Sequence, residues 1–193
     1  MKKQISYLFL LTSSILLSSC GAEQAFTTWP CRFIYDNSIH LDQTLATATN
    51  PASAGIFCKI TETSRGGAKY LVFENNQALS STQIETATEL RSNLRLGLNN
   101  GIIVGFQTFG GFTAYDIQCI NCVEKENNYS SPSYRLTMDK KGTGIATCSN
   151  CGRQYDLNNG GLITNGEKGD KSLQPYRNAQ TSGPQGVTTV FSE

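Results

Sequence analysis

Short apolar runs separated by polar, glycine-rich turns make up most of the chain. The runs are rich in Val, Ile, Thr, Tyr and Phe, and few of them keep the three-to-four-residue spacing of a buried helix face. This combination is typical of short β-strands joined by turns, and it predicts an all-β fold. We expect strands over residues 32–35, 55–60, 69–73, 101–106, 112–117, 134–138, 144–147, 154–157 and 187–191.

One segment has helical spacing. The sequence from Thr82 to Glu85 has the spacing of a capping box, in which each side chain accepts a hydrogen bond from the other residue's backbone N–H. Apolar residues then recur every three or four positions. We therefore expect one helix after Thr82, and these are the residues that keep rough helical spacing: Ile84, Ala87, Leu90 and Leu94.

The first 20 residues have the pattern of an export signal. Lys2 and Lys3 precede an apolar run over residues 5–17, which is too short to span a bilayer core of roughly 30 Å. Residues 17–20 read Leu-Ser-Ser-Cys, which resembles the lipobox of bacterial lipoproteins. That resemblance implies cleavage before Cys20 and lipid attachment to its thiol, whereas the alternative is an ordinary secretory signal with Cys20 incidental.

These features predict the organisation of the chain and its place in the cell. We expect a signal peptide over residues 1–19, a lipidated tether over residues 20–30 and a single β-rich domain over residues 31–193. The protein would be lipid-anchored in the bacterial cell envelope, at the inner or the outer membrane. Without a twin-arginine pair, export by the general route of unfolded chains is expected.

The charge balance excludes one class of partner. The formal net charge is +1 and no long basic or acidic run occurs, so neither nucleic acid nor an anionic surface is an evident partner. The lipid on Cys20 predicts a membrane as the one partner, and the sequence identifies no protein or small-molecule ligand.

Two cysteines stand alone in the first third of the domain. Cys31 and Cys58 lie at or within predicted strands of an exported protein, where oxidising conditions favour disulfides. We expect a disulfide between them, worth about 2–4 kcal/mol. The alternative is a pair of buried free thiols.

The other four cysteines form two Cys-x-x-Cys pairs, Cys119 with Cys122 and Cys148 with Cys151. Each pair follows a predicted strand, and two such pairs facing each other make a tetrahedral four-sulfur site that suits zinc or iron. Gly152 strengthens the second pair, because glycine lets the chain turn beneath a metal. Two structural disulfides are the alternative.

Three motifs resemble the Rieske [2Fe-2S] fold superfamily. Residues 112–119 (FTAYDIQC) are similar to the strand that enters the first Rieske cluster loop, and residues 148–160 (CSNCGRQYDLNNG) resemble the second loop. Residues 173–176 (LQPY) resemble the stretch that closes the fold. The resemblance covers residues 101–178 and implies an antiparallel β-sandwich or barrel with a small cluster-binding hairpin subdomain.

The ligands depart from the Rieske pattern. A Rieske centre uses two cysteines and two histidines, whereas this sequence has Cys151 at the second-loop histidine position and Cys122 one residue beyond the first. The chain's single histidine, His40, lies far from both loops and is expected to be a loop residue. A two-histidine cluster is therefore excluded.

Three states of the four-cysteine site remain open. Structural zinc in a non-catalytic envelope or binding protein is favoured, because zinc needs no assembly machinery. A four-cysteine [2Fe-2S] cluster would make the chain an electron-transfer protein, and disulfides would leave it metal-free. No histidine is placed to activate a nucleophile and no phosphate-binding loop occurs, so nothing indicates an enzyme. Asp116 and Asp156 are expected to be hydrogen-bonding residues rather than acid–base groups.

Overall fold

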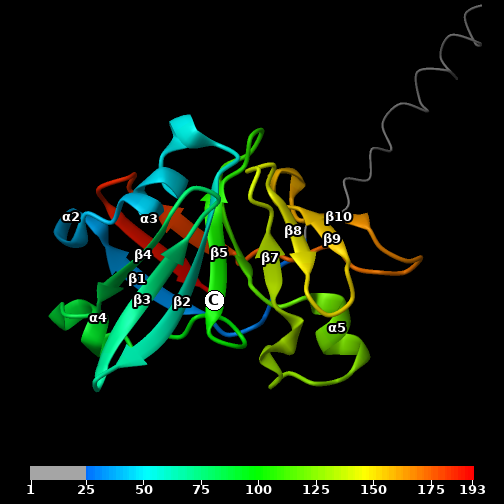
Figure 1. The fold of residues 1–193 in the computed structure, drawn as a ribbon, viewed down its shortest axis with the longest axis horizontal. Coiled ribbons are helices and arrows are strands. Elements are labelled where there is room, and N and C mark those ends of the chain that lie inside the picture. The colour runs from blue at the N-terminus through cyan, green and yellow to red at the C-terminus, as the bar shows by residue number, and fades with distance from the viewer. Residues whose placement is uncertain (1–24) are drawn as a thin grey trace, which may run out of the picture.

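The computed structural model describes residues 25–193, and β-sheet is their main regular structure (Figure 1). The strands form three antiparallel sheets, none of which closes into a barrel within the described residues. The predicted all-β class is confirmed at this level. The predicted signal peptide and Cys20 lie outside the described residues.

The largest sheet has five strands in the order β4-β3-β2-β5-β6. Gly66 and Gly67, both with positive φ, make the tight turn between β2 and β3. The strands of this sheet are β2 (Phe57–Arg65), β3 (Ala68–Glu74), β4 (Leu79–Gln83), β5 (Gly101–Phe106) and β6 (Phe112–Asp116).

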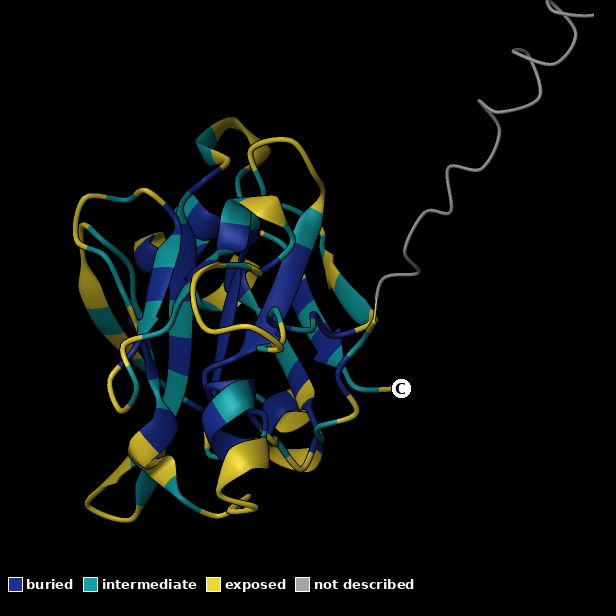
Figure 2. Cartoon of the chain, turned by 90° about the vertical axis from the view of Figure 1, so that its right-hand side faces the viewer, coloured by how far each residue is buried: buried dark blue, intermediate teal, exposed yellow. Residues whose placement is uncertain are grey.

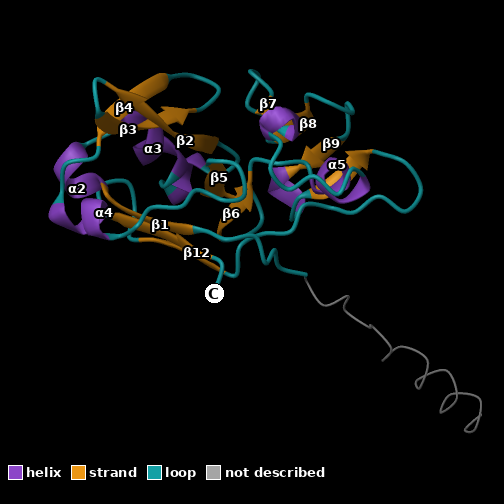
Figure 3. Ribbon diagram, turned by 90° about the horizontal axis from the view of Figure 1, so that it is seen from below, coloured by secondary structure: helices purple, strands orange, loops and turns teal. Residues whose placement is uncertain are grey.

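A second sheet joins the two ends of the domain. It has the order β1-β12-β11, with β1 at Arg32–Asp36, β11 at Asn178–Thr181 and β12 at Val187–Phe191. Figure 3 shows this sheet as a layer facing the five-stranded sheet. Phe33, Tyr35 and Val190 bury their side chains between the two layers.

The third sheet belongs to a separate unit that lies between β6 and β11 in the sequence. It has the order β10-β9-β8-β7 and lies beside the five-stranded sheet in Figure 1, with helix α5 below it. The elements of this unit are α5 (Ile120–Lys125), η2 (Pro132–Tyr134), β7 (Leu136–Met138), β8 (Ile145–Cys148), β9 (Gln154–Asp156), η3 (Leu157–Asn159) and β10 (Leu162–Asn165).

Two buried cores share the strands β5 and β6 (Figure 2). Ile102 and Val104 belong to the core between the two larger sheets, whereas Ile103 points to the core of the third sheet. In β6, Ala114 belongs to the core between the two larger sheets and Tyr115 to the core of the third sheet. Alternate strand residues face opposite sides of a sheet, so burial on both sides explains why β5 is apolar throughout.

The helices are short and cover the edges of the first core. They are α2 (Asn37–His40), α3 (Gln43–Ala48), α4 (Ala87–Arg91) and the 3-10 turn η1 (Pro51–Ser53). None of the helices formed by residues 25–193 is long and apolar enough to cross a membrane.

The predicted helix start at Thr82 is wrong. Thr82 lies in β4, where it pairs with Leu71 of β3. The helix begins four residues later, because Thr86 and Glu89 offer the same spacing and form the capping box. Pairing with β3 therefore keeps Thr82 in a strand, and Thr86 with Glu89 caps α4 instead.

The described part of the predicted tether packs against the domain. The guanidinium of Arg177 lies 4.5 Å from the centre of the Phe26 ring, and the backbone N–H of Thr27 donates to the carbonyl of Pro175 at 3.0 Å. Trp29 packs against the core of the third sheet. Residues 25–30 are thus part of the folded domain and do not form a free linker.

Cys31 and Cys58 both lie in the core between the larger sheets. Both are free thiols in the structure, so the predicted disulfide between them is absent from it. Burial raises the pKa of the Cys31 thiol to about 12 and raises that of Cys58 further, which keeps both sulfurs protonated and unreactive. The disulfide therefore stays a prediction, and peptide mapping without reductant tests it directly.

Candidate metal centre

The structure brings the four remaining cysteines into one cluster. Their sulfur atoms all lie within 4.8 Å of one another. The shortest contacts join one pair to the other: Cys119 Sγ lies 3.9 Å from Cys151 Sγ, and Cys122 Sγ lies 3.7 Å from Cys148 Sγ. All four are free thiols. The prediction that the two Cys-x-x-Cys pairs form a single unit is confirmed.

The first pair lies at the start of α5. Cys119 is the N-cap residue of this helix and follows β6 closely, and Cys122 lies in its first turn. The sequence predicted one helix only, after Thr82, so α5 was not expected. The helix places the Cys119 and Cys122 side chains on one side, since residues three apart share a helix face.

The second pair lies in the turn after β8. Cys148 is the last residue of β8, and the backbone N–H of Gly152 donates to its carbonyl at 3.0 Å. Gly152 has a φ of +74°, a conformation that other residues rarely adopt. The glycine therefore closes the turn that directs Cys148 and Cys151 to the same point, as the sequence predicted.

Each of the four sulfurs accepts a hydrogen bond. Backbone N–H groups within the two turns donate to Cys119 and Cys148. Side chains supply the others: the Asn150 amide lies 3.5 Å from Cys122 Sγ, and the Arg153 guanidinium donates to Cys151. Hydrogen bonds of this kind stabilise thiolates more than thiols.

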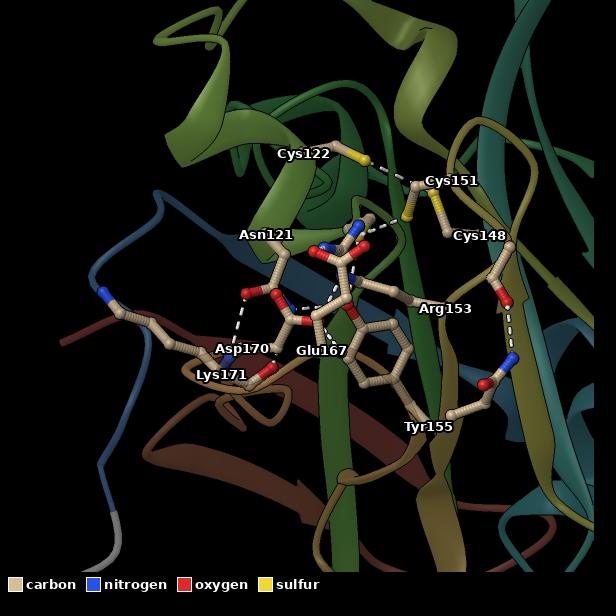
Figure 4. A network of polar contacts seen from close by, with 12 residues as sticks. Asn121, Cys122, Cys148, Cys151, Arg153, Tyr155, Glu167, Asp170 and Lys171 are labelled. Atoms are coloured by element: carbon tan, nitrogen blue, oxygen red, sulfur yellow. Dashed lines mark hydrogen bonds and ion pairs between the residues drawn. The ribbon is translucent and has the colours of Figure 1, made fainter.

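The hydroxyl of Tyr155 lies 3.0 Å from Cys119 Sγ (Figure 4). The side-chain amide of Asn121 donates to that hydroxyl at 2.9 Å and to the carbonyl of Lys171 at 2.8 Å, and the N–H of Lys171 donates back to Asn121 at 2.8 Å. These bonds hold the Tyr155 ring and the segment around Lys171 against the first pair.

Arg153 connects the cluster to the loop after β10. Its Nε atom donates to Asp170 at 2.6 Å, and Glu167 lies 3.5 Å away (Figure 4). Of the four cysteines, Cys151 is partly exposed and the other three are buried. The guanidinium therefore lies beside the most solvent-accessible of the four sulfurs.

The surroundings give the thiols of Cys119 and Cys122 very different pKa values. The pKa of Cys119 is lowered to about 5, first because the Cys148 thiol donates a hydrogen bond to it and also because of the Tyr155 hydroxyl. Burial raises the pKa of Cys122 to about 11. The surroundings thus favour a thiolate at Cys119, whereas a bound cation would be needed to ionise Cys122 at neutral pH.

Asp116 and Tyr176 join the segment 112–119 to the segment 173–176. The Asp116 carboxylate accepts hydrogen bonds from the N–H groups of Leu98 and Gln118 and from the Tyr176 hydroxyl, all at 2.7–2.8 Å. Asp156 accepts from the N–H of Asn158 at 2.9 Å and caps η3. Both aspartates hold local structure, as predicted.

His40 is not the loop residue that the sequence predicted. It is the last residue of α2, its side chain is 8% exposed, and its Nε2 atom lies 2.8 Å from Glu89 Oε1. Its ring stacks on Tyr35 with centroids 4.8 Å apart. His40 thus supports the first core and does not belong to the cysteine cluster.

Sequence reasoning missed Tyr155, Arg153, Asn121 and Asn150 as partners of the sulfurs. Three of them lie inside or within four residues of the second pair, so closeness in sequence was a usable signal. Asn121 lies inside the first pair, but its hydrogen bonds join it to Tyr155 and Lys171, 34 and 50 positions away, and no local pattern indicated those contacts.

Comparison with protein-family models, curated proteins and solved structures found no match to this chain.

Proposed function

We propose that this chain is an exported, lipid-anchored protein whose four-cysteine centre binds one zinc ion that stabilises the fold. The observation that carries the proposal is the spacing of the four sulfurs, all within 4.8 Å of one another. Zinc bound tetrahedrally at about 2.3 Å needs sulfurs about 3.8 Å apart. The two shortest contacts, 3.7 and 3.9 Å, agree with this geometry.

The same spacing favours one ion over a two-iron cluster. In a four-cysteine [2Fe-2S] cluster, two cysteines bind each iron and inorganic sulfides bridge the irons. The two cysteine pairs must then lie farther apart than they do around a single ion. Here the shortest sulfur–sulfur distances, 3.7 and 3.9 Å, join one cysteine pair to the other, so the two pairs are not held apart.

A structural role is favoured over a catalytic one. Catalytic zinc sites keep a position open for water or substrate, whereas structural sites fill all four with protein ligands. Three of the four sulfurs are buried, and each accepts a hydrogen bond from its surroundings. The cluster also lies within the core of the third sheet, whose small size makes a metal crosslink valuable.

The Rieske-like assignment is part of this proposal. Contacts between the first and the third motif support it: Tyr176 N–H donates to the carbonyl of Ala114, and the Tyr176 hydroxyl donates to Asp116. The unit that holds the cysteines is inserted between strands of the larger sheets. A Rieske-like domain with its histidine ligands replaced would have this organisation.

Electron transfer through bound iron is the second candidate. The hydrogen bonds to all four sulfurs favour it, because such bonds set the potential of iron–thiolate centres, and Cys151 provides a partly exposed ligand. A colour test separates the candidates. Iron–thiolate centres absorb visible light, whereas zinc and disulfides do not.

The deciding experiment is metal analysis of the full chain purified from its native envelope. We expect one zinc per chain, a colourless protein, and loss of the metal in each of the variants Cys119→Ala, Cys122→Ala, Cys148→Ala and Cys151→Ala. These four variants should be destabilised to a similar extent, since a site with three thiolates leaves charge and geometry unsatisfied. Cys58→Ala is the matched control, because it removes a buried thiol outside the cluster.

Two results would contradict the proposal. Two irons per chain with visible absorption would establish the electron-transfer candidate. A metal-free protein with disulfides at both Cys-x-x-Cys pairs would remove the metal site altogether.

A further inference from the structure

The folded domain begins close to the predicted lipid anchor. Phe26 is held beneath Arg177, and Thr27 is hydrogen-bonded to Pro175 and only 5% exposed. Six residue steps separate Cys20 from Phe26, and an extended chain advances at most about 3.6 Å per step. A lipid on Cys20 would therefore lie within about 20 Å of Phe26, so the edge of the domain around Phe26 must stay near the membrane.

The hairpin between β5 and β6 shares this edge. A cavity of about 220 Å³ is lined by Phe26 and Arg177 together with Gln107, Gly111 and Phe112 from the base of the hairpin. The hairpin base is stiffened by the rings of Phe106 and Phe112, whose centroids are 5.4 Å apart. Its tip is two residues from either side of the base, hence within about 7 Å of residues that line the cavity.

Phe109 occupies that tip and is 99% exposed, more than any other large apolar side chain of residues 25–193. The surrounding turn, Gln-Thr-Phe-Gly-Gly over residues 107–111, carries no charge. The charged residues nearby are Arg177, which is exposed, and Asp156, whose carboxylate already accepts a hydrogen bond from Asn158. An aromatic ring beside a cation suits the boundary between acyl chains and phosphate headgroups.

We propose that this edge is a membrane-facing surface on which Phe109 enters the headgroup region of the bilayer that holds the lipid anchor. The occupant is a phospholipid surface, with the Phe109 ring among the upper acyl chains and Arg177 near the phosphates. The inference rests on the proposed lipid anchor at Cys20. It adds a fixed orientation: the domain does not swing freely, because residues 26–29 are packed on it and Phe109 makes a second membrane contact beside them.

Quenching by brominated lipid tests the proposal on the full lipidated chain. The Trp29→Phe variant removes the chain's single tryptophan, and Phe109→Trp then places one indole at the hairpin tip. The matched control is Tyr129→Trp in the same background. Tyr129 is an exposed aromatic held by Asn99, next to the opposite end of β5. Both proteins are reconstituted into vesicles of phosphatidylethanolamine and phosphatidylglycerol, with and without brominated acyl chains.

We expect the F109W emission to shift to the blue on vesicles and to be quenched by brominated lipid, while the Y129W emission stays unchanged. Absence of quenching for F109W on vesicle-bound protein overturns the membrane-facing surface and leaves the anchor intact. Equal quenching of both variants also overturns it, because the domain then has no fixed orientation. Flotation separates these results from failure of the anchor: a wild-type chain that floats no better than Cys20→Ala would refute both.

Discussion

Arg153 is a cation beside the cysteine cluster. Four thiolates around a divalent ion leave two negative charges in a largely buried site, and the Arg153 guanidinium lies beside Cys151, where it offsets part of that charge. Asp170 and Glu167 hold the guanidinium in place on its other side. Arg153 would therefore act on a bound metal through the sulfur of Cys151.

We predict that Arg153→Gln lowers metal affinity by about 10- to 100-fold, the usual effect of losing a partner of a metal ligand. Asp170→Asn should lower it less, because the guanidinium remains but is no longer oriented. Competition with a chromophoric chelator measures both. Arg177→Gln is the matched control, since Arg177 contacts Phe26 and not the cluster. An affinity unchanged in R153Q would show that charge compensation at Cys151 is unimportant.

Asp116 should make the stability of the domain depend on pH. Burial raises the pKa of its carboxyl from 3.8 to about 6, although three hydrogen bonds oppose that shift. The folded state thus favours the protonated form of Asp116 more than the unfolded chain does. Its stabilising contribution is fully present below pH 3.8 and is lost as the pH rises through about 6.

Relative to Asp116→Asn, we expect the free energy of unfolding of the wild type to rise as the pH falls from 7 to 4, by up to about 3 kcal/mol. The Asn variant lacks the titrating carboxyl, so its free energy of unfolding should lack this pH-dependent part, whether the variant is more or less stable than the wild type. Urea unfolding at several pH values measures the difference between the two proteins. A difference that is constant over this range would show that Asp116 does not titrate as described.

At the scale of elements, the pair of His40 and Glu89 joins α2 to α4. Glu89 is 2% exposed, accepts from the backbone N–H of Thr86 within the capping box and lies 2.8 Å from the His40 ring. The Glu89 carboxylate therefore caps α4 and also binds His40 of α2. Removing the imidazole would leave a buried carboxylate without its main partner.

We predict that His40→Phe, which keeps an aromatic ring against Tyr35, destabilises the domain by about 2–3 kcal/mol. Adding Glu89→Gln should recover part of that loss, because the uncompensated charge is removed. Denaturant unfolding of the two single variants and the double variant gives the coupling energy. Strictly additive effects would mean that the contact contributes nothing, and the metal content should be the same in all of these proteins.

The strands with strong local patterns were predictable from sequence. β5 matches its predicted range and β12 does too, because apolar and β-branched runs bounded by turns leave few alternatives. The polar edge strands β4, β10 and β11 were not predicted. Their conformation depends on pairing with a neighbour distant in sequence rather than on their own residues.

The cysteine cluster was predictable because the spacing of its cysteines is typical of metal sites. The residues that surround and position the cysteines were not predictable. Cys119 and Cys151 follow from the repeated Cys-x-x-Cys pattern, whereas α5 is too short to show helical periodicity. The contact between Asn121 and Lys171 links positions 50 residues apart, which no local pattern encodes. The sequence thus identified the four clustered cysteines, and only the fold identifies the groups that hold them in place.

For the whole molecule, the division into two cores determines what a metal can stabilise. The first core is built from the two larger sheets and several helices, while the second depends on short strands, α5 and the four cysteines. β5 and β6 contribute to both. Loss of metal should therefore affect the two halves unequally, with the shared strands as the boundary.

We predict that metal removal by a chelator selectively loosens residues 119–173, the unit that contains the second core. Hydrogen exchange should accelerate in α5, β7, β8 and β9 and stay slow in β2 and β3, since structural metal binding supplies folding energy to the segment that provides the ligands. Cys148→Ala should reproduce this pattern, and Cys58→Ala should instead weaken β2. Uniform acceleration in both halves would contradict two separable cores, and unchanged exchange in α5 and β8 would show that the four sulfurs contribute no metal-linked stability.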